Sequence, residues 1–171
     1  SFTAFGVPAN ATFTDNTDGT GTFDFNPDYS QSGTYDVTFI ATDGALSDTE
    51  IVTITVNHVN LAPELASIGA QSTTEGIQLQ FGVSATDFDL DPLTLTTSTP
   101  PSTASFTDNG NGTGTFDWIP LYIDNGTYDI TFYVNDGALT DSEVVTITVN
   151  EAGNQPPEIQ PVDTQFVTEG V

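Results

Sequence analysis

Most of this chain consists of two near-copies of one sequence. Residues 11–57 recur at residues 104–150, shifted by 93 positions, and 31 of the 47 residues are identical. A third copy begins near the C-terminus, where Pro63-Glu64-Leu65 reappears as Pro157-Glu158-Ile159. Near-identical tandem repetition is typical of arrays, in which the number of modules sets a length. It indicates a structural or adhesive polymer, because an enzyme has no need of two adjacent copies of one unit.

The offset between the copies predicts where each module lies. Residue 1 aligns with residue 94 and residue 171 with residue 77, so the chain begins and ends inside a module. We expect residues 1–58 to form a module without its first strands and residues 59–152 to form a complete module. Residues 153–171 are then the first strand of a third module. The sequence contains no apolar run of transmembrane length and no signal peptide or anchor motif.

The charged side chains almost all carry one sign. There are 24 Asp and Glu residues but no Lys or Arg, which gives a net charge of −24. Side-chain salt bridges are therefore excluded, apart from those of a protonated His58. Nucleic acids and anionic membrane surfaces are excluded as direct partners, because both are bound through Lys and Arg. The chain has no Cys either, so disulfides and thiolate metal sites are absent.

Hydrophobic alternation predicts β-strands throughout the complete module. Apolar side chains occupy every second position in several runs, and turns rich in Asn, Asp and Gly separate these runs. Seven short antiparallel strands in one module of 93 residues are typical of an all-β sandwich. We predict strands near residues 64–73, 78–86, 92–98, 103–108, 113–119, 126–135 and 140–150.

A tyrosine near the start of the sixth predicted strand supports an immunoglobulin-like sandwich. Tyr128 and its counterpart Tyr35 have the sequence context of a tyrosine corner, in which the hydroxyl group bonds back to the preceding loop. Antibody domains have a Cys two residues later, where this chain has Ile130 and Val37. Aliphatic packing is therefore expected to replace the disulfide.

Four segments of the chain resemble prokaryotic immunoglobulin-like and cadherin-like (dystroglycan-type) repeats, namely residues 60–65, 75–76, 81–95 and 126–132. The resemblance covers essentially the whole chain and implies tandem seven-stranded sandwiches. It also implies an extracellular or cell-surface stalk, adhesin or filament without catalytic activity. Its partners would be neighbouring copies of the same repeat or subunit.

The resemblance further implies calcium ions between modules. Cadherin-type sites combine a Glu at the base of one module, the linker, and acidic loops at the top of the next module. Calcium takes six to eight oxygen ligands, and alternating Asp residues present several of them on one side of a loop. The matching residues are Asp87, Asp89, Asp91 and Asp136 in loops, Asn57, Asn60, Glu151 and Asn154 in linkers, and Glu75 and Asp124 at the base.

The match to cadherin sites has departures. The first linker has Asn where the strongest sites have Asp, and the Asp-Arg-Glu element of cadherins is missing. An alternative interpretation of Asp87, Asp89 and Asp91 is a set of solvated loop residues, because Asp favours turns.

A carbohydrate-binding accessory module of a secreted multidomain protein is the alternative function, with surface glycans as partners. Such modules often display an exposed aromatic side chain, and Trp118 is the only Trp. Trp118 aligns with Phe25, however, and an aromatic residue retained in both copies favours a core position. His58 lies in a linker and is replaced by Glu151 in the next copy, so we expect it to be exposed and not catalytic.

Overall fold

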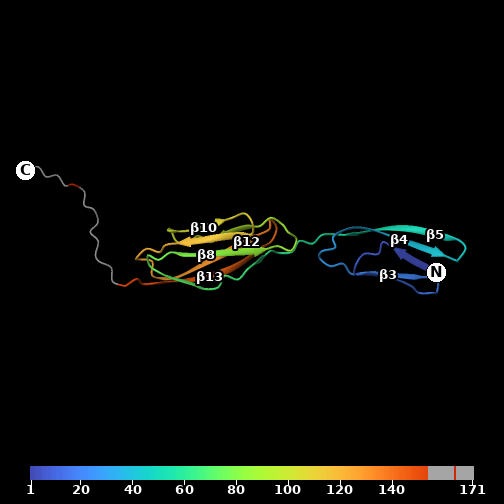
Figure 1. Cartoon of the computed structure of the whole chain (residues 1–171), viewed down its shortest axis with the longest axis horizontal. Coiled ribbons are helices and arrows are strands. Elements are labelled where there is room, and N and C mark those ends of the chain that lie inside the picture. The colour runs from blue at the N-terminus through green and yellow to red at the C-terminus, as the bar shows by residue number, and fades with distance from the viewer. Residues whose placement is uncertain (154–163, 165–171) are drawn as a thin grey trace, which may run out of the picture. The chain divides into compact units, whose positions relative to one another are not determined.

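The computed structural model describes residues 1–153 and residue 164. These residues form thirteen strands, β1 to β13 (Figure 1), and contain no helix that is long and apolar enough to cross a membrane. The described residues divide into two compact units: residues 1–62 with 87–91, and residues 63–86 with the described residues from 92 onward. The expected first strand of a third module, residues 153–171, lies almost entirely outside the described residues.

The second unit is a sandwich of two four-stranded sheets. One sheet has the strand order β10-β11-β8-β6 and the other has the order β7-β13-β12-β9. All the described strand pairs in this unit are antiparallel except β7 and β13, which are parallel. This is the all-β, immunoglobulin-like architecture that the alternation predicted. The strands are β6 (Glu64–Leu65), β7 (Gln71–Thr74), β8 (Leu79–Thr86), β9 (Thr94–Thr97), β10 (Ala104–Asp108), β11 (Thr113–Trp118), β12 (Gly126–Asn135) and β13 (Thr140–Asn150).

The predicted first strand, residues 64–73, is wrong in one respect, because it forms two strands in two different sheets. β6 pairs with β8, whereas β7 pairs with β13 in the opposite sheet. Residues 66–70 therefore pass from one sheet to the other at the edge of the sandwich.

Two carboxylates on β13 form hydrogen bonds with the segment that passes between the sheets. Glu143 accepts hydrogen bonds from the backbone N–H groups of Ile68 (2.8 Å) and Gly69 (2.9 Å), and Asp141 accepts one from Leu65 (2.9 Å). Hydrogen bonds to a charged acceptor contribute more than those between neutral groups. The path of this segment thus depends on acids about 75 residues later in the chain.

The core of the second unit lies between its two sheets, with Phe132 near the centre. The Phe132 side chain is fully buried. Its ring makes edge contacts with the rings of Phe81, Phe106 and Phe116 at centroid distances of 5.7, 5.5 and 5.8 Å. Such tilted aromatic pairs are favourable beyond the area that they bury.

Both predicted tyrosine corners are confirmed. The Tyr128 hydroxyl donates to the carbonyl oxygen of Asp124 (3.0 Å), and the Tyr35 hydroxyl donates to that of Gln31 (2.9 Å). The Tyr128 ring packs edge-on against Trp118 at a centroid distance of 4.9 Å. Trp118 is fully buried, as its alignment with another aromatic residue predicted.

The first unit contains the same motifs in two smaller sheets, β1-β4-β5 and β2-β3. Phe39 contacts the rings of Phe13 and Phe23 at 5.3 and 5.7 Å. The described residues of this unit contain no counterparts of β6, β7 and β8, and Val52 is 40% exposed, whereas Val145 at the equivalent position is 1% exposed. The strands are β1 (Phe2–Phe5), β2 (Ala11–Asp15), β3 (Gly21–Phe25), β4 (Gly33–Thr42) and β5 (Ser47–Val56).

Acidic side chains in the turns accept hydrogen bonds from the backbone. Asp43 accepts them from the N–H groups of Leu46 and Ala45, both at 2.8 Å. These two hydrogen bonds hold the pKa of Asp43 below its ordinary value of 3.8. The backbone N–H group of Phe2 is the main group that lowers the pKa of Asp15. Backbone N–H groups thus donate the hydrogen bonds that carboxylates of other proteins receive from Lys and Arg side chains.

We predict that Glu143→Ala lowers the free energy of unfolding of the second unit by about 1.5–3 kcal/mol, because two backbone N–H groups lose a charged acceptor. Urea unfolding followed by Trp118 fluorescence measures this, since the single Trp reports on the second unit alone. Glu64→Ala is the matched control, because it removes the same charge from an exposed side chain of the same unit. We expect that control to change the free energy by less than about 0.5 kcal/mol. An equal loss in both variants would contradict the role of Glu143.

The lowered pKa of Asp43 predicts a pH dependence with a definite sign. A carboxyl group whose pKa is lower in the folded state stabilises that state above its unfolded pKa. This contribution is lost as the pH falls through the folded pKa, which here lies below 3.8. Asp43→Asn keeps an acceptor oxygen but does not titrate. Between about pH 6 and pH 2.5, the first unit should therefore lose less stability in Asp43→Asn than in the unchanged protein, as measured by circular dichroism melting.

Candidate metal centre

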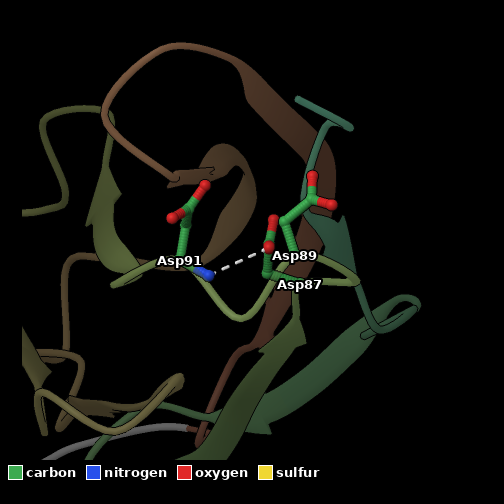
Figure 2. Close-up of side chains that lie close together, drawn as sticks. All are labelled: Asp87, Asp89 and Asp91. Atoms are coloured by element: carbon green, nitrogen blue, oxygen red, sulfur yellow. Dashed lines mark hydrogen bonds between the residues drawn. The ribbon is translucent and has the colours of Figure 1, made fainter. Parts of the chain in front are cut away.

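Three carboxylates lie together on the short loop that follows β8. One carboxylate oxygen from each of Asp87, Asp89 and Asp91 lies within 4.8 Å of the others. Figure 2 shows the three side chains extending from the same side of the loop. Oxygens on opposite sides of a calcium ion are separated by twice the Ca–O distance, which is about 4.6–5.2 Å. The spacing of the three carboxylates therefore fits a single calcium ion.

The oxygens of this cluster differ in their hydrogen bonding. Asp87 Oδ1 accepts a hydrogen bond from the backbone N–H group of Asp91 at 3.1 Å (dashed in Figure 2). Asp89 Oδ2 accepts one from the backbone N–H group of Leu61 at 2.7 Å. Asp87 Oδ2 is buried, and it is the one buried side-chain oxygen or nitrogen of the described residues without a hydrogen-bond partner. A buried carboxylate oxygen without a donor is unfavourable unless a cation or a water molecule contacts it.

The negative charge of the cluster has little compensation from the protein. His58 Nε2 lies 4.0 Å from Asp89 Oδ2, but the His58 side chain is 50% exposed and that of Asp89 is only 5% exposed. Two carboxylates 4.8 Å apart repel each other by about 3.5 kcal/mol at an effective dielectric constant of 20. A divalent cation would offset this repulsion.

The loop also contains a residue in an unfavourable backbone conformation. Leu90 lies between two of the acids and has a φ of 65°, in the left-handed region that a leucine seldom adopts. Its side chain is 87% exposed, so burial of the side chain does not compensate for this conformation. Strain of this kind costs roughly 1–3 kcal/mol and is concentrated at functional sites.

Asp136 lies on the turn after β12, and its carboxylate accepts hydrogen bonds from the backbone of that turn. It is 9% exposed, and its Oδ1 accepts hydrogen bonds from the backbone N–H groups of Ala138 (2.7 Å) and Leu139 (2.6 Å). It is not a member of the three-acid group that the described residues contain. Its role as a metal ligand stays a prediction.

The base residues Glu75 and Asp124 lie in the second unit, where Glu75 links two backbone segments. Glu75 is 3% exposed, and its two oxygens accept hydrogen bonds from the backbone N–H groups of Asn125 and Ala152, both at 3.1 Å. Burial, together with the negative charges of Asp124 and Glu75, raises the pKa of Tyr128. Glu75 thus connects the corner before β12 to the segment that follows β13. Metal binding by Glu75 or Asp124 stays a prediction.

The linker residues differ in exposure. Asn57 and Glu151 are exposed, Asn60 is half-buried, and Asn154 lies outside the described residues. Their roles as ligands stay predictions. No sequence pattern identifies the linker group that does contact the acidic loop, because this group is the backbone N–H of Leu61 and any residue type except Pro could provide it.

Comparisons with known proteins identify one family and several similar chains. A family model described as "Bacterial Ig domain" matches residues 60–148. Chitinase A of Pseudoalteromonas piscicida is 32% identical over 112 residues, which cover 65% of this chain and 13% of the chitinase. Among solved structures, the endo-fucoidan hydrolase MfFcnA4 of glycoside hydrolase family 107 is 23% identical with a TM-score of 0.47, and the match covers 89% of this chain and 23% of that chain.

A two-domain structure of human protocadherin-24, EC1-2, is 24% identical with a TM-score of 0.42, and the match covers 54% of this chain and 44% of that chain. This chain therefore spans only a small part of the two hydrolases and less than half of the protocadherin structure. The family model matches more than half of this chain, and the chain accordingly belongs to the bacterial immunoglobulin-like (Bacterial Ig) domain family.

Proposed function

We propose that this chain is a non-catalytic spacer in a secreted or cell-surface protein, in which tandem modules hold other domains at a distance. The observation that carries the proposal is the repetition, with 31 of 47 residues identical between two adjacent modules, of which the second matches the family model. In a repeat array each module needs its own core and contacts with its neighbours, and a conserved reactive site is not required. The partners of each module are then neighbouring copies of the same repeat.

We further propose that calcium stiffens this spacer at the loop after β8. Asp87, Asp89 and Asp91 would hold the ion, and the partnerless Asp87 Oδ2 supports this assignment. The ion would supply the positive charge that a chain without Lys or Arg lacks. Asp89 also accepts the hydrogen bond from Leu61, so fixing this carboxylate would fix the linker segment as well.

Calcium should raise the melting temperature of the protein. Extracellular calcium sites have dissociation constants of about 0.1–1 mM, so about 10 mM calcium stabilises the folded state by roughly 1.4–2.7 kcal/mol. For a module of this size we expect a rise of at least about 5 °C relative to EDTA. Circular dichroism melting measures it. The comparison buffer should contain NaCl at the same ionic strength, because screening alone stabilises a chain with a net charge of −24.

Two variants separate ion binding from general screening. Asp87→Asn with Asp89→Asn keeps the shape of both side chains and one acceptor oxygen on each, but removes two charges. In EDTA this variant should be at least as stable as the unchanged protein, because repulsion in the loop decreases. In calcium it should gain little stability, whereas the exposed control Glu64→Gln should gain as much as the unchanged protein. If calcium still raised the melting temperature of the Asp87→Asn, Asp89→Asn variant as much as that of the unchanged protein, this site would be ruled out.

A carbohydrate-binding accessory module is the second candidate function. The observation that favours it is the similarity to a chitinase, of which this chain matches only 13%. Trp118 is not the sugar platform, since it is fully buried and its Nε1 donates to the Thr103 hydroxyl at 2.9 Å. An exposed aromatic side chain would have to be provided elsewhere in the fold.

A further inference from the structure

The turn between β10 and β11 contains an asparagine whose counterpart in the first copy is an aspartate. Asn111 is exposed and precedes Gly112, and the equivalent residue of the first unit is Asp18, which precedes Gly19. An Asn side chain becomes an Asp side chain when it loses ammonia and takes up water. The first copy therefore contains, at this position, the product of a reaction that is open to the second copy.

The two turns have the same hydrogen bonds at this position. Asn111 Oδ1 accepts from the hydroxyl group (2.6 Å) and the backbone N–H group (3.2 Å) of Thr113. Asp18 Oδ1 accepts from the hydroxyl group (2.6 Å) and the backbone N–H group (3.0 Å) of Thr20. In the first unit these donors, the hydroxyl group above all, hold the pKa of Asp18 below its ordinary value of 3.8. The turn around Asn111 thus offers the donors that favour a negatively charged oxygen, although its side chain is a neutral amide.

The hydroxyl group of Thr113 is oriented toward Asn111. Its Oγ1 accepts a hydrogen bond from Asn109 Nδ2 at 3.0 Å, and its own proton is therefore donated to Asn111 Oδ1. Together with the backbone N–H group of Thr113, it places two donors on one carbonyl oxygen. Donors in this arrangement stabilise the negative charge that develops on a carbonyl oxygen when a nucleophile attacks its carbon.

The nucleophile is the backbone nitrogen of the next residue. Gly112 has no side chain to hinder the approach, and within the described part of the chain its N–H group donates no hydrogen bond. We propose that Asn111 is a site of spontaneous deamidation and that Thr113 promotes the reaction by stabilising the charge on Oδ1. This inference goes beyond the spacer function, and it depends neither on that function nor on calcium.

The reaction needs only water and a base from the solvent. The Gly112 nitrogen gives up its proton and forms a bond to Cγ of Asn111, while the bond from Cγ to Nδ2 breaks and Nδ2 leaves as ammonia. The product is a cyclic imide between the two residues. Water then opens the imide at either of its two carbonyl groups, which gives an aspartate or an isoaspartate at position 111.

The two products would affect the turn differently. An aspartate would keep the hydrogen bonds that Asp18 makes in the first unit. An isoaspartate lengthens the backbone by one carbon atom, and this turn has two backbone hydrogen bonds that depend on its length. Asn109 N–H donates to Thr113 O (2.9 Å), and Ala85 N–H donates to Gly112 O (2.8 Å). We therefore expect the isoaspartate form to weaken the β10–β11 hairpin.

The chain has two other Asn-Gly pairs, and both lack this arrangement. In the pair 109–110, the N–H group that would attack is bound to Asp108 Oδ1 (2.9 Å), and this carboxylate opposes loss of the proton. In the pair 125–126, the backbone N–H group of Asn125 is bound to Glu75 Oε1 (3.1 Å), and Gly126 is already paired in β12. No described residue donates to the side-chain oxygen of Asn125. These two pairs are internal controls.

The test compares the deamidation rates of Asn111, Asn109 and Asn125 in the full chain at mildly alkaline pH. Mass spectrometry of chymotryptic fragments measures each site, since trypsin has no Lys or Arg to cut at. We expect Asn111 to react fastest. Thr113→Val should slow its reaction about threefold or more, because one donor to the oxygen is lost, and Thr113→Ser should restore the rate. Thr127→Val is the matched control, because Thr127 follows Asn125 at the same spacing but is exposed and makes no such bond.

Urea provides a second control. In the unfolded chain the three Asn-Gly pairs are equally exposed, so unfolding should remove most of the advantage of Asn111. Circular dichroism in the absence of urea checks that every variant is folded.

Each outcome supports or overturns the proposal. Fastest conversion at Asn111 that is slowed by Thr113→Val and restored by Thr113→Ser supports it. No conversion at Asn111, or faster conversion at Asn109 or Asn125, overturns the assignment of the site. If Thr113→Val leaves the rate unchanged or increases it, the hydroxyl group does not promote the reaction. If Asn111 keeps its full advantage in urea, the local sequence and not the folded turn is responsible, which also overturns the role of Thr113.

Discussion

The whole structure depends on one constraint, which is that its carboxylates have no basic side chains to pair with. At least thirteen of the 24 acids accept a hydrogen bond from a backbone N–H group instead. Some of these bonds close turns, as at Asp43, and others join segments far apart in the chain, as at Glu143 and Glu75. Acidic residues thereby hold the loops and strand ends of the sandwich in place.

The loop after β8 is where this compensation is incomplete. Three carboxylates lie together there, and one buried oxygen of Asp87 has no donor. A cation from solution is the partner that we propose for this group, and calcium suits both its oxygen chemistry and its spacing. In the proposed spacer, unpaired negative charge would make neighbouring modules repel each other, and bound ions would reduce that repulsion.

Much of the fold could be predicted from local patterns in the sequence. Alternation located β8, β12 and β13, the context of Tyr128 predicted its corner, and the aligned aromatic at Trp118 predicted burial. The division of residues 64–73 between two sheets could not be predicted, because alternation does not say which sheet a strand joins. Carboxylates about 75 residues away decide it. The spacing of Asp87, Asp89 and Asp91 indicated an acidic cluster, whereas no local pattern showed that the backbone N–H group of Leu61 contacts it.

Backbone N–H groups donate hydrogen bonds to at least thirteen of the 24 acids, and we propose that cations from solution bind where the backbone does not. Carbon-13 NMR of the Asp and Glu carboxyl groups during a calcium titration tests this most directly, because it observes each acid separately. We expect the signals of Asp87, Asp89 and Asp91 to move with one common dissociation constant, while those of Asp43 and Glu143 stay in place. Small shifts spread evenly over all acids, or no shift at the loop after β8, would contradict it.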